Sequence, residues 1–313
     1  MVSVTISSSR PTALARGLPI DVEIPGKTVE DATIADVKSA ILAKFPKFSV
    51  ERQKITLEGE KKALGDELTF QQAGVLDGGM LNVKDLGPQI SWRTVFLVEY
   101  GGPLIIHPLI YYFPEVFYGG PVRHSQLQTY VYALVMLHFI KREAETLFVH
   151  RFSHATMPFG NIFKNSAHYH LLSGIALAWA VYGPKYAATS PLVIRSYRSD
   201  PNTLNVIAAL WAFAEVSNLI VHLNLRSLRP AGTRRRAVPH GYGFNLVSCP
   251  NYLFEILAWV AIALMTNNIV AWIFVVVSTY QMTVWAIKKH KGYKKEFGNE
   301  YPRGRKVVIP FIF

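Results

Sequence analysis

Beyond Pro88 the sequence consists largely of long apolar runs, and this feature constrains the fold more than any other. A helix needs about 20 apolar residues to cross the hydrocarbon core of a bilayer. The runs therefore predict an α-helical multi-pass membrane bundle of about six or seven spans. The six clearest runs are Thr94–Phe113, Gln128–Ile140, Ala167–Gly183, Thr203–Leu223, Tyr252–Thr266 and Ile269–Ile287. Because the second and fifth are short, tilted or partly embedded helices are an alternative there.

The charge is divided as unevenly as the hydropathy. Residues 1–90 hold 11 basic and 12 acidic side chains, whereas residues 91–313 hold 22 and 9, so the net charge of +12 belongs to the second part. These basic residues lie between apolar runs and not along one polar helix, which favours a membrane protein over a nucleic-acid-binding protein. The positive-inside rule then places both termini in the cytosol. It places three basic clusters there too: Lys141–Lys164, Arg226–Arg236 and Lys288–Lys306.

The first part of the chain has the pattern of a small α+β domain. Thr33 and Asp36 have the spacing of a capping box, which predicts a helix beginning there. Alternating apolar residues predict strands at Val2–Ile6, Ile20–Ile24, Ile55–Leu57 and Met80–Val83. This order resembles the ubiquitin-like β-grasp fold, so we expect a β-grasp domain over residues 1–86 and a membrane domain over residues 87–313. Because the chain continues through Leu86-Gly87-Pro88, the first domain is expected to be an embedded adaptor and not a conjugated modifier.

The segment Asn245–Glu255, NLVSCPNYLFE, is a polar stretch that leads into an apolar run. Pro250 suits the first turn of a helix, so Ser248 or Cys249 is expected at the helix cap. The next turn carries an amide, a phenol and a carboxylate at a membrane boundary: Asn251, Tyr252 and Glu255. The spacing predicts that these three groups share one helical face, and this is the first place to look for chemistry.

Other polar residues lie inside or beside the apolar runs. Glu99 and Glu215 are candidates for functional groups because an ionisable residue within a span is costly, although Glu99 could also pair with Arg93. Four more residues recur at i, i+3, i+4 and i+7 and share one helical face: His138, Lys141, Arg142 and Glu145. This face is either a basic wall for phosphate groups, extended by Arg226, Arg229 and Arg234–Arg236, or a solvated helix end with intrahelical ion pairs.

Several kinds of site are excluded by the sequence. The single cysteine, Cys249, excludes an internal disulfide framework and a cysteine-based zinc site. Two pairs of histidines are similar to the boxes of membrane di-iron enzymes: His150 with His154, and His168 with His170. None of the ten histidines has a histidine neighbour, however, so no metal site is predicted. Neither a G-x-G-x-x-G after a strand nor a P-loop is present, so a nucleotide must be held between helices.

Four segments together resemble the very-long-chain trans-2-enoyl-CoA reductases, a branch of the steroid 5α-reductase family. They are KREAETLFVHRFSHATMP (Lys141–Pro158), NLRSLRPAG (Asn224–Gly232), VSCPNYLFE (Val247–Glu255) and the terminal HKGYKKEFGNEYPRGRKVVIPFIF. The resemblance covers the whole chain, since that branch also has the ubiquitin-like domain. It implies an enzyme of the endoplasmic reticulum membrane that uses NADPH to reduce the 2,3 double bond of a long- or very-long-chain enoyl-CoA, the last step of each elongation cycle. The implied partners are the enoyl-CoA substrate, the bilayer, and the elongase, ketoacyl-CoA reductase and hydroxyacyl-CoA dehydratase.

The resemblance also implies roles for single residues. Hydride would reach C3, and Tyr252 matches the tyrosine regarded as the proton donor to C2. Glu99 matches the embedded glutamate that orients the substrate carbonyl. The residues expected to hold NADPH are Asn218, Arg226, Arg229, Asn251, His290 and Tyr293, with Glu255 orienting them and with Lys141 and Arg142 on the basic face. His222 stands where the steroid reductases have an acidic residue, so the contacts with the nicotinamide cannot be copied unchanged.

Three other functions remain open from the sequence. A 5α-reductase-like enzyme could reduce a sterol or a polyprenol, and substrate profiling with NADPH oxidation would show this. A methyltransferase of the isoprenylcysteine type has a similar C-terminal layout and would bind S-adenosylmethionine in preference to NADPH. A non-catalytic membrane adaptor would act through the ubiquitin-like domain alone.

Overall fold

The computed structural model describes residues 1–313 except 9, 11, 153, 154 and 230–236. His154 and Arg234–Arg236, which the sequence singled out, therefore lie outside the described residues. Contacts between residues divide the chain into two units, and each is described by itself. The first comprises Met1–Trp92 and His154–Asn161, and the second comprises Arg93–Ser153 and Ile162–Phe313.

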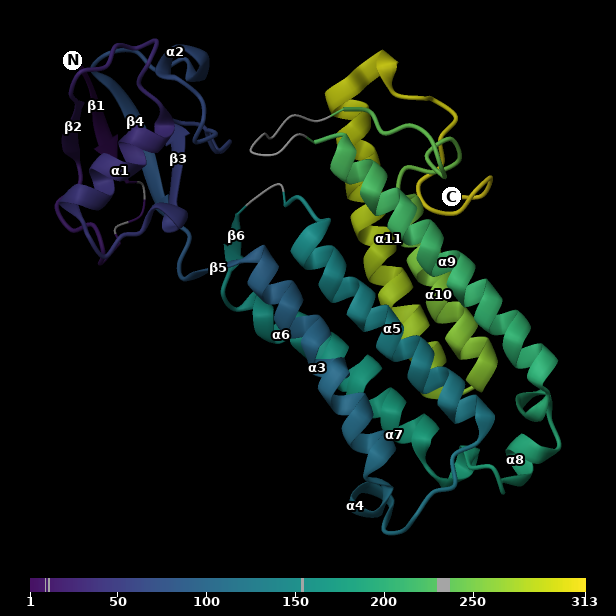
Figure 1. Cartoon of the computed structure of the whole chain (residues 1–313). Coiled ribbons are helices and arrows are strands. Elements are labelled where there is room, and N and C mark those ends of the chain that lie inside the picture. The colour runs from purple at the N-terminus through teal and green to yellow at the C-terminus, as the bar shows by residue number, and fades with distance from the viewer. Residues whose placement is uncertain (9, 11, 153–154, 230–236) are drawn as a thin grey trace. The chain divides into compact units, whose positions relative to one another are not determined.

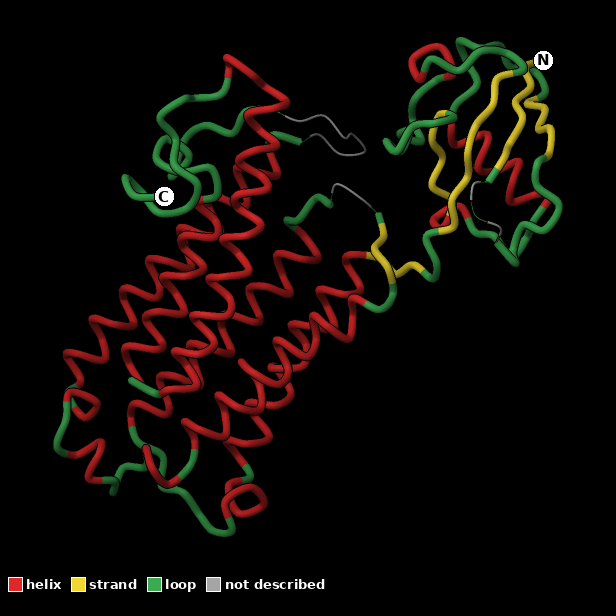
Figure 2. Tube along the Cα trace, turned by 180° about the vertical axis from the view of Figure 1, so that it is seen from behind, coloured by secondary structure: helices red, strands yellow, loops and turns green. Residues whose placement is uncertain are grey.

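The first unit contains a four-stranded sheet with one long helix packed against it (Figure 2). The strands are β1 (Val2–Ser7), β2 (Ile20–Ile24), β3 (Gln53–Leu57) and β4 (Gly79–Asp85), and their order in the sheet is β2-β1-β4-β3. The two central strands β1 and β4 are parallel, and the other neighbours are antiparallel. All four predicted strands are confirmed.

Helix α1 (Ile34–Lys44) covers the sheet because its apolar stripe is buried against the strands. Ile34, Val37 and Ile41 are fully buried, in one cluster with strand residues such as Val4 and Val22. The predicted capping box is confirmed: the Asp36 amide donates to Thr33 Oγ1 at 3.3 Å, and the Thr33 amide donates to Asp36 Oδ2 at 2.7 Å. Short helical segments follow at Val50–Arg52 and, as α2, at Phe70–Ala73.

A two-stranded ribbon completes the first unit. Strand β5 (Gln89–Ser91) pairs antiparallel with β6 (Thr156–Pro158). The pairing brings together two parts of the chain that are more than 60 residues apart, one just before helix α3 and one just before helix α6.

The end of strand β4 is held by a carboxylate, and this predicts how stability depends on pH. Arg52 donates to both oxygens of Asp85, at 3.0 and 2.7 Å, and these bonds hold the pKa of Asp85 below its ordinary value of 3.8. A carboxylate whose pKa is lower in the folded state stabilises the fold above about pH 5, and the contribution is lost as the pH falls through the folded-state pKa. We expect Asp85→Asn to cost about 1 kcal/mol at pH 7 and progressively less as the pH falls through the folded-state pKa of Asp85.

Hydrogen exchange of the β3 and β4 amides in the full chain measures this cost. Glu58→Gln, a change at an exposed carboxylate nearby, serves as the control. Equal protection of wild type and Asp85→Asn at pH 7 would contradict the expected contribution.

The second unit is a bundle of helices that lie side by side (Figure 1). Its long helices are α3 (Trp92–Tyr112), α5 (Gln126–Phe148), α9 (Pro201–Ser227), α10 (Pro250–Thr266) and α11 (Ile269–Phe297). Its short helical segments are α4 (Pro114–Tyr118), Pro184–Tyr186, α8 (Pro191–Ile194), Tyr197–Ser199 and Gly298–Glu300. Helix α10 packs against α9, α5 and α11, so it has neighbours on several sides.

The predicted run Ala167–Gly183 is helical but not uniformly α-helical. Helix α6 (Asn161–Ala167) continues through the π-helix η2 (His168–Ala176) into α7 (Leu177–Tyr182). The π-helix approaches α3 closely, since His170 Nε2 hydrogen-bonds to the Val98 carbonyl at 2.9 Å. A Cβ atom on Gly102 would lie 2.2 Å from the His170 ring, so this approach requires glycine there.

Three helices among the described residues are long and apolar enough to cross a membrane: α3, α9 and the helix that begins at Ile269. They contain three of the six predicted runs. Helix α10 is apolar but has only 17 residues, and α5 ends in a charged segment. The number of spans therefore stays a prediction, while the helical character of all six runs is confirmed.

Candidate functional site

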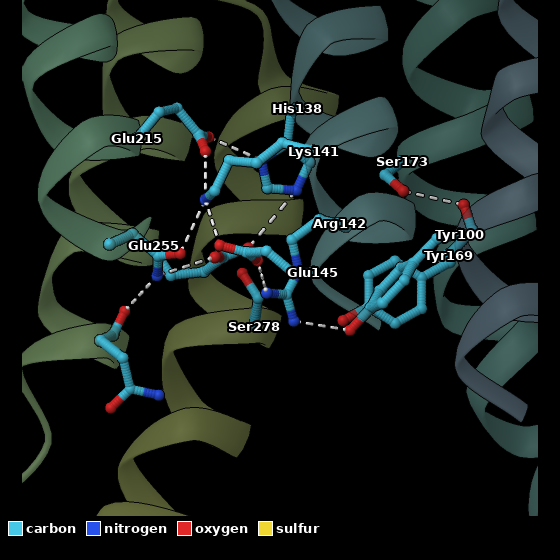
Figure 3. A network of polar contacts seen from close by, with 12 residues as sticks. Tyr100, His138, Lys141, Arg142, Glu145, Tyr169, Ser173, Glu215, Glu255 and Ser278 are labelled. Atoms are coloured by element: carbon cyan, nitrogen blue, oxygen red, sulfur yellow. Dashed lines mark hydrogen bonds and ion pairs between the residues drawn. The ribbon is translucent and has the colours of Figure 1, made fainter. Parts of the chain in front are cut away.

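Helix α5 turns one polar face into the interior of the second unit (Figure 3). Ser125 begins this helix with a capping box, accepting from the Gln128 amide. The four residues of the predicted face bond mainly to side chains of other helices, and two of them, His138 and Glu145, are only 0% and 1% exposed. A solvated helix end is therefore wrong, because these groups are buried, whereas the intrahelical ion pairs of that alternative are present, from Lys141 and Arg142 to Glu145.

Glu215 of α9 is the first partner of this face. His138 Nδ1 lies 2.6 Å from one carboxylate oxygen of Glu215, and Lys141 Nζ donates to the other at 2.7 Å. Lys141 also donates to Asn218 Oδ1 at 2.7 Å. A buried carboxylate needs such compensation, because an unpaired charge in the interior costs several kcal/mol.

Residues in the first two turns of α10 also contact Asn218 and the polar face of α5. Asn218 Nδ2 donates to the Asn251 carbonyl at 2.8 Å and to Glu255 Oε2 at 3.4 Å. His138 Nε2 lies 3.4 Å from Glu255 Oε1. The structure thus brings together four residues that the sequence assigned to the site, Asn218, Asn251, Glu255 and Lys141.

Arg142 connects this face to helix α3. One guanidinium nitrogen donates to Glu145 Oε2 at 2.6 Å, and another donates to the Tyr100 hydroxyl at 2.8 Å. Tyr100 follows Glu99 directly in α3, and its hydroxyl interacts electrostatically with the Glu99 carboxylate. Glu99 is 2% exposed, and its Oε2 atom has no hydrogen-bond partner among the described residues. The predicted site residues Glu99 and Arg142 are therefore joined through a tyrosine that the sequence analysis did not single out.

Two histidines surround the Glu145 carboxylate. His222 Nδ1 lies 3.0 Å from Oε1, and His150 Nε2 lies 4.0 Å from Oε2. Burial, followed by the charge of Arg142, lowers the pKa of His150 to about 2, so this imidazole is neutral. Ligand atoms of the three residues lie within 4.8 Å of one another, which is compatible with a metal ion. Lys141 and Arg142 also contact this carboxylate, however, and already balance its charge. We therefore regard Glu145 as the centre of an ion-pair cluster.

Helix α10 begins where the sequence predicted. Asn251, Tyr252 and Glu255, however, do not share one face as predicted. Cys249 is the cap residue and Pro250 follows it, and burial raises the pKa of the Cys249 thiol to about 11. Tyr252 packs instead in a cluster with Cys249, Ala286 and Val308. Lys289 of α11 lies over its ring, 4.9 Å from the centroid. Tyr252 thus points towards α11, whereas Asn251 and Glu255 contact residues of α9 and α5.

The C-terminal tail folds back onto the segment before α10. The Ser248 amide donates to the Lys306 carbonyl at 2.8 Å, and the Lys306 amide donates to the Leu246 carbonyl at 3.0 Å. Ser248 Oγ hydrogen-bonds to His290 Nδ1 at 2.5 Å and to the Tyr301 hydroxyl at 2.6 Å. Tyr293 stacks on Tyr301, with ring centroids 5.6 Å apart. The predicted residues His290 and Tyr293 therefore belong to this tail cluster.

Arg305 is a residue of the tail cluster that the sequence analysis did not assign. Its guanidinium lies 4.9 Å from the Tyr301 ring centroid, and the residue is only 5% exposed. Its Nε and Nη1 atoms have no hydrogen-bond partner among the described residues. The charged motif YPRGRK could have indicated it, but its burial depends on the tail folding back.

The two remaining predicted arginines lie at the end of α9. Arg226 is exposed in the last turn. Arg229 donates from Nη1 to the Arg151 carbonyl at 2.9 Å, and Arg151 in turn donates to the Arg229 carbonyl. These reciprocal bonds join the end of α9 to the segment after α5.

Comparison with known proteins gives consistent results. A family model described as 3-oxo-5-alpha-steroid 4-dehydrogenase matches residues 155–313. A putative enoyl reductase of Schizosaccharomyces pombe is 46% identical over 311 residues, which is 99% of this chain and 100% of the relative. A very-long-chain enoyl-CoA reductase of Dictyostelium discoideum is 38% identical over 91% of this chain and 93% of the relative. A probable very-long-chain enoyl-CoA reductase of Caenorhabditis elegans is 39% identical over 90% and 91%.

Proposed function

Because this chain belongs to the steroid 5α-reductase family and to its branch of very-long-chain enoyl-CoA reductases, we propose that it reduces the 2,3 double bond of long- and very-long-chain trans-2-enoyl-CoA with NADPH. Similarity over nearly the whole length of proteins with that name is the observation that carries the proposal. The buried polar cluster of α5, α9 and α10 adds a place for polar chemistry inside an otherwise apolar bundle. An acyl chain and a charged coenzyme require such a junction of apolar and polar surroundings.

The residues of the tail fit a phosphorylated cofactor. A buried guanidinium with two unpartnered nitrogens is costly unless an anion binds it, and Arg305 has this arrangement. We propose that Arg305 acts with the predicted residues Arg226, Arg229, His290 and Tyr293 on the phosphates and the adenine half of NADPH. Asn218, Asn251, Glu255, Lys141 and Arg142 would hold the nicotinamide half. When bound, NADPH supplies the hydride for C3.

In this proposal the side chains of the protein handle the carbonyl and the proton. Glu99 orients the thioester carbonyl, and Tyr252 donates a proton to C2. Lys289, 4.9 Å from the Tyr252 ring centroid, places a cation beside the phenolate that this transfer leaves. Water from the cytosolic side then restores the phenol.

Removal of the Arg305 guanidinium tests the cofactor assignment. We expect Arg305→Met to weaken NADPH binding about 10- to 100-fold, because a charge-assisted hydrogen bond contributes about 1.5–3 kcal/mol. Isothermal titration of the purified full chain with NADPH measures this. Arg303→Met is the matched control, since Arg303 is exposed two residues earlier. Unchanged affinity in Arg305→Met would remove Arg305 from the cofactor site.

The cellular setting follows from the same proposal. We propose that the enzyme acts in the endoplasmic reticulum membrane with both termini in the cytosol, beside the elongase, ketoacyl-CoA reductase and hydroxyacyl-CoA dehydratase. Residues 1–86, which make up most of the first unit, would be a ubiquitin-like β-grasp domain. The sheet order β2-β1-β4-β3 with a parallel central pair and a covering helix supports that assignment.

Reduction of a 3-oxo-Δ4 sterol is the second candidate, because the matching family model is described by that activity. One assay on the purified full chain distinguishes the two candidate activities. NADPH oxidation is followed with trans-2-octadecenoyl-CoA and with a 3-oxo-Δ4 steroid at equal concentrations. Oxidation with the enoyl-CoA alone supports the main proposal, and oxidation with the steroid alone overturns it.

A further inference from the structure

The phenol of Tyr100 occupies an unusual position in the buried cluster (Figure 3). Arg142 donates to its hydroxyl oxygen at 2.8 Å, and the guanidinium carbon also lies 4.9 Å from the ring centroid. Because arginine can only donate, the Tyr100 oxygen is the acceptor and its own hydrogen remains available to a second partner. Tyr100 is 2% exposed, so these contacts are made out of water, where they are stronger.

The Glu99 carboxylate belongs to the preceding residue of α3, is also buried, and interacts electrostatically with the Tyr100 hydroxyl. The hydroxyl therefore points into the same region as the residue proposed to orient the substrate carbonyl. A carbonyl oxygen that enters this region offers an acceptor for the Tyr100 hydrogen.

Glu145 fixes Arg142 from the opposite side. Its Oε2 atom accepts from Arg142 at 2.6 Å, and its Oε1 atom lies 3.0 Å from His222 and 3.5 Å from Lys141. Glu145 is 1% exposed and has contacts on several sides, so its position is well determined. The guanidinium is held between a carboxylate that neutralises it and a phenol that it polarises.

We propose that Tyr100 donates a hydrogen bond to the thioester carbonyl oxygen of the enoyl-CoA, with Arg142 behind the phenol and with Glu145 as the positioning residue that fixes Arg142. The inference rests on the proposed enoyl-CoA reduction and adds two residues to it. Hydride addition at C3 moves the π electrons towards the carbonyl oxygen, and the Tyr100 hydrogen bond stabilises that negative charge. The charge returns to C2 when the proton is added there, so Tyr100 keeps its own proton through the cycle.

A ligand with its own absorption band tests the hydrogen bond without turnover. The probe is a 2,4-dienoyl-CoA of long chain, whose conjugated thioester absorbs at longer wavelength when its carbonyl is polarised. We expect the full-length wild type to shift this band to the red on binding. Tyr100→Phe is expected to bind the probe with similar affinity and to abolish the shift. A shift that persists in Tyr100→Phe overturns the proposal, and no binding by the wild type overturns the proposed substrate itself.

Kinetic measurements then distinguish the role of Tyr100, the hydrogen-bond donor, from that of Glu145, which positions Arg142. We expect Tyr100→Phe to lower kcat about 10²-fold with little change in KM, as for the loss of one donor to a developing oxyanion. Glu145→Gln keeps the shape of the side chain and is expected to lower kcat about 10-fold and to reduce the red shift in part. Glu115→Gln, at an exposed position on α4, is the control and should keep both values. Equal behaviour of Glu145→Gln and Glu115→Gln would overturn the role of Glu145.

Discussion

Replacing Tyr252 by phenylalanine is expected to lower turnover of a C18 enoyl-CoA about 10³-fold while leaving the fold intact. A positioned general acid contributes about 10²- to 10⁴-fold, and phenylalanine lacks the hydroxyl that would donate to C2. The aromatic ring itself packs with Cys249, Ala286 and Val308, and phenylalanine keeps these contacts. Single-turnover measurement of NADPH oxidation by the purified full chain, at saturating NADPH, gives the rate of the chemical step.

The control for this change is Tyr280→Phe, since Tyr280 lies on α11 and is 71% exposed. It should react at the rate of the wild type. A wild-type rate in Tyr252→Phe would show that another group donates the proton. If Tyr100→Phe were then inactive, we would assign proton donation to Tyr100, in the buried cluster of α3 and α5, and not to Tyr252.

The local features of this chain could be predicted because they depend on neighbours in sequence. The capping box of Thr33 with Asp36, the alternation in β1 and the proline at the start of α10 each act within one turn or one strand. The spacing of His138, Lys141, Arg142 and Glu145 likewise required only the period of a helix. All these predictions are confirmed as local structure.

Partners across helices could not be predicted in the same way. The period of α5 shows that Arg142 and Glu145 share a face, but not that Tyr100 and His222 are opposite to it. The orientation of Tyr252 depends on the rotation of α10 about its axis, which is set by packing against several helices. Neighbouring positions on a helix differ by about 100°, so Tyr252 and Asn251 contact different elements.

The burial of Arg305 is a second example of a long-range effect. A sequence of alternating charges and glycine near a chain end is typical of a solvated tail. Here the tail pairs with the residues before α10 through Lys306 and Ser248, and this pairing encloses the guanidinium. Backbone bonds between residues nearly 60 positions apart have no local signal in the sequence.

Removing the ammonium group of Lys141 is expected to produce the largest loss of stability. Lys141 donates to Glu215 and Asn218 and lies 3.5 Å from Glu145, so Lys141→Met leaves two buried carboxylates with less compensation. Breaking a buried ion pair by removing one partner costs about 3–5 kcal/mol. For a unit of this size the cost corresponds to a fall in Tm of roughly 6–20 °C. Thermal unfolding of the full chain in detergent micelles measures it.

The double variant Lys141→Met with Glu215→Gln shows whether the loss comes from the uncompensated charge. Glu215→Gln removes the carboxylate that Lys141 neutralises and keeps an oxygen within reach of His138, whose Nδ1 lies 2.6 Å from Glu215. We therefore expect the double variant to be more stable than Lys141→Met alone, with a coupling of about 1–3 kcal/mol between the two sites. Lys291→Met, at an exposed position on α11, should change stability by less than about 0.5 kcal/mol. Additive losses in the double variant would mean that Lys141 stabilises the bundle through packing of its aliphatic chain and not through its charge.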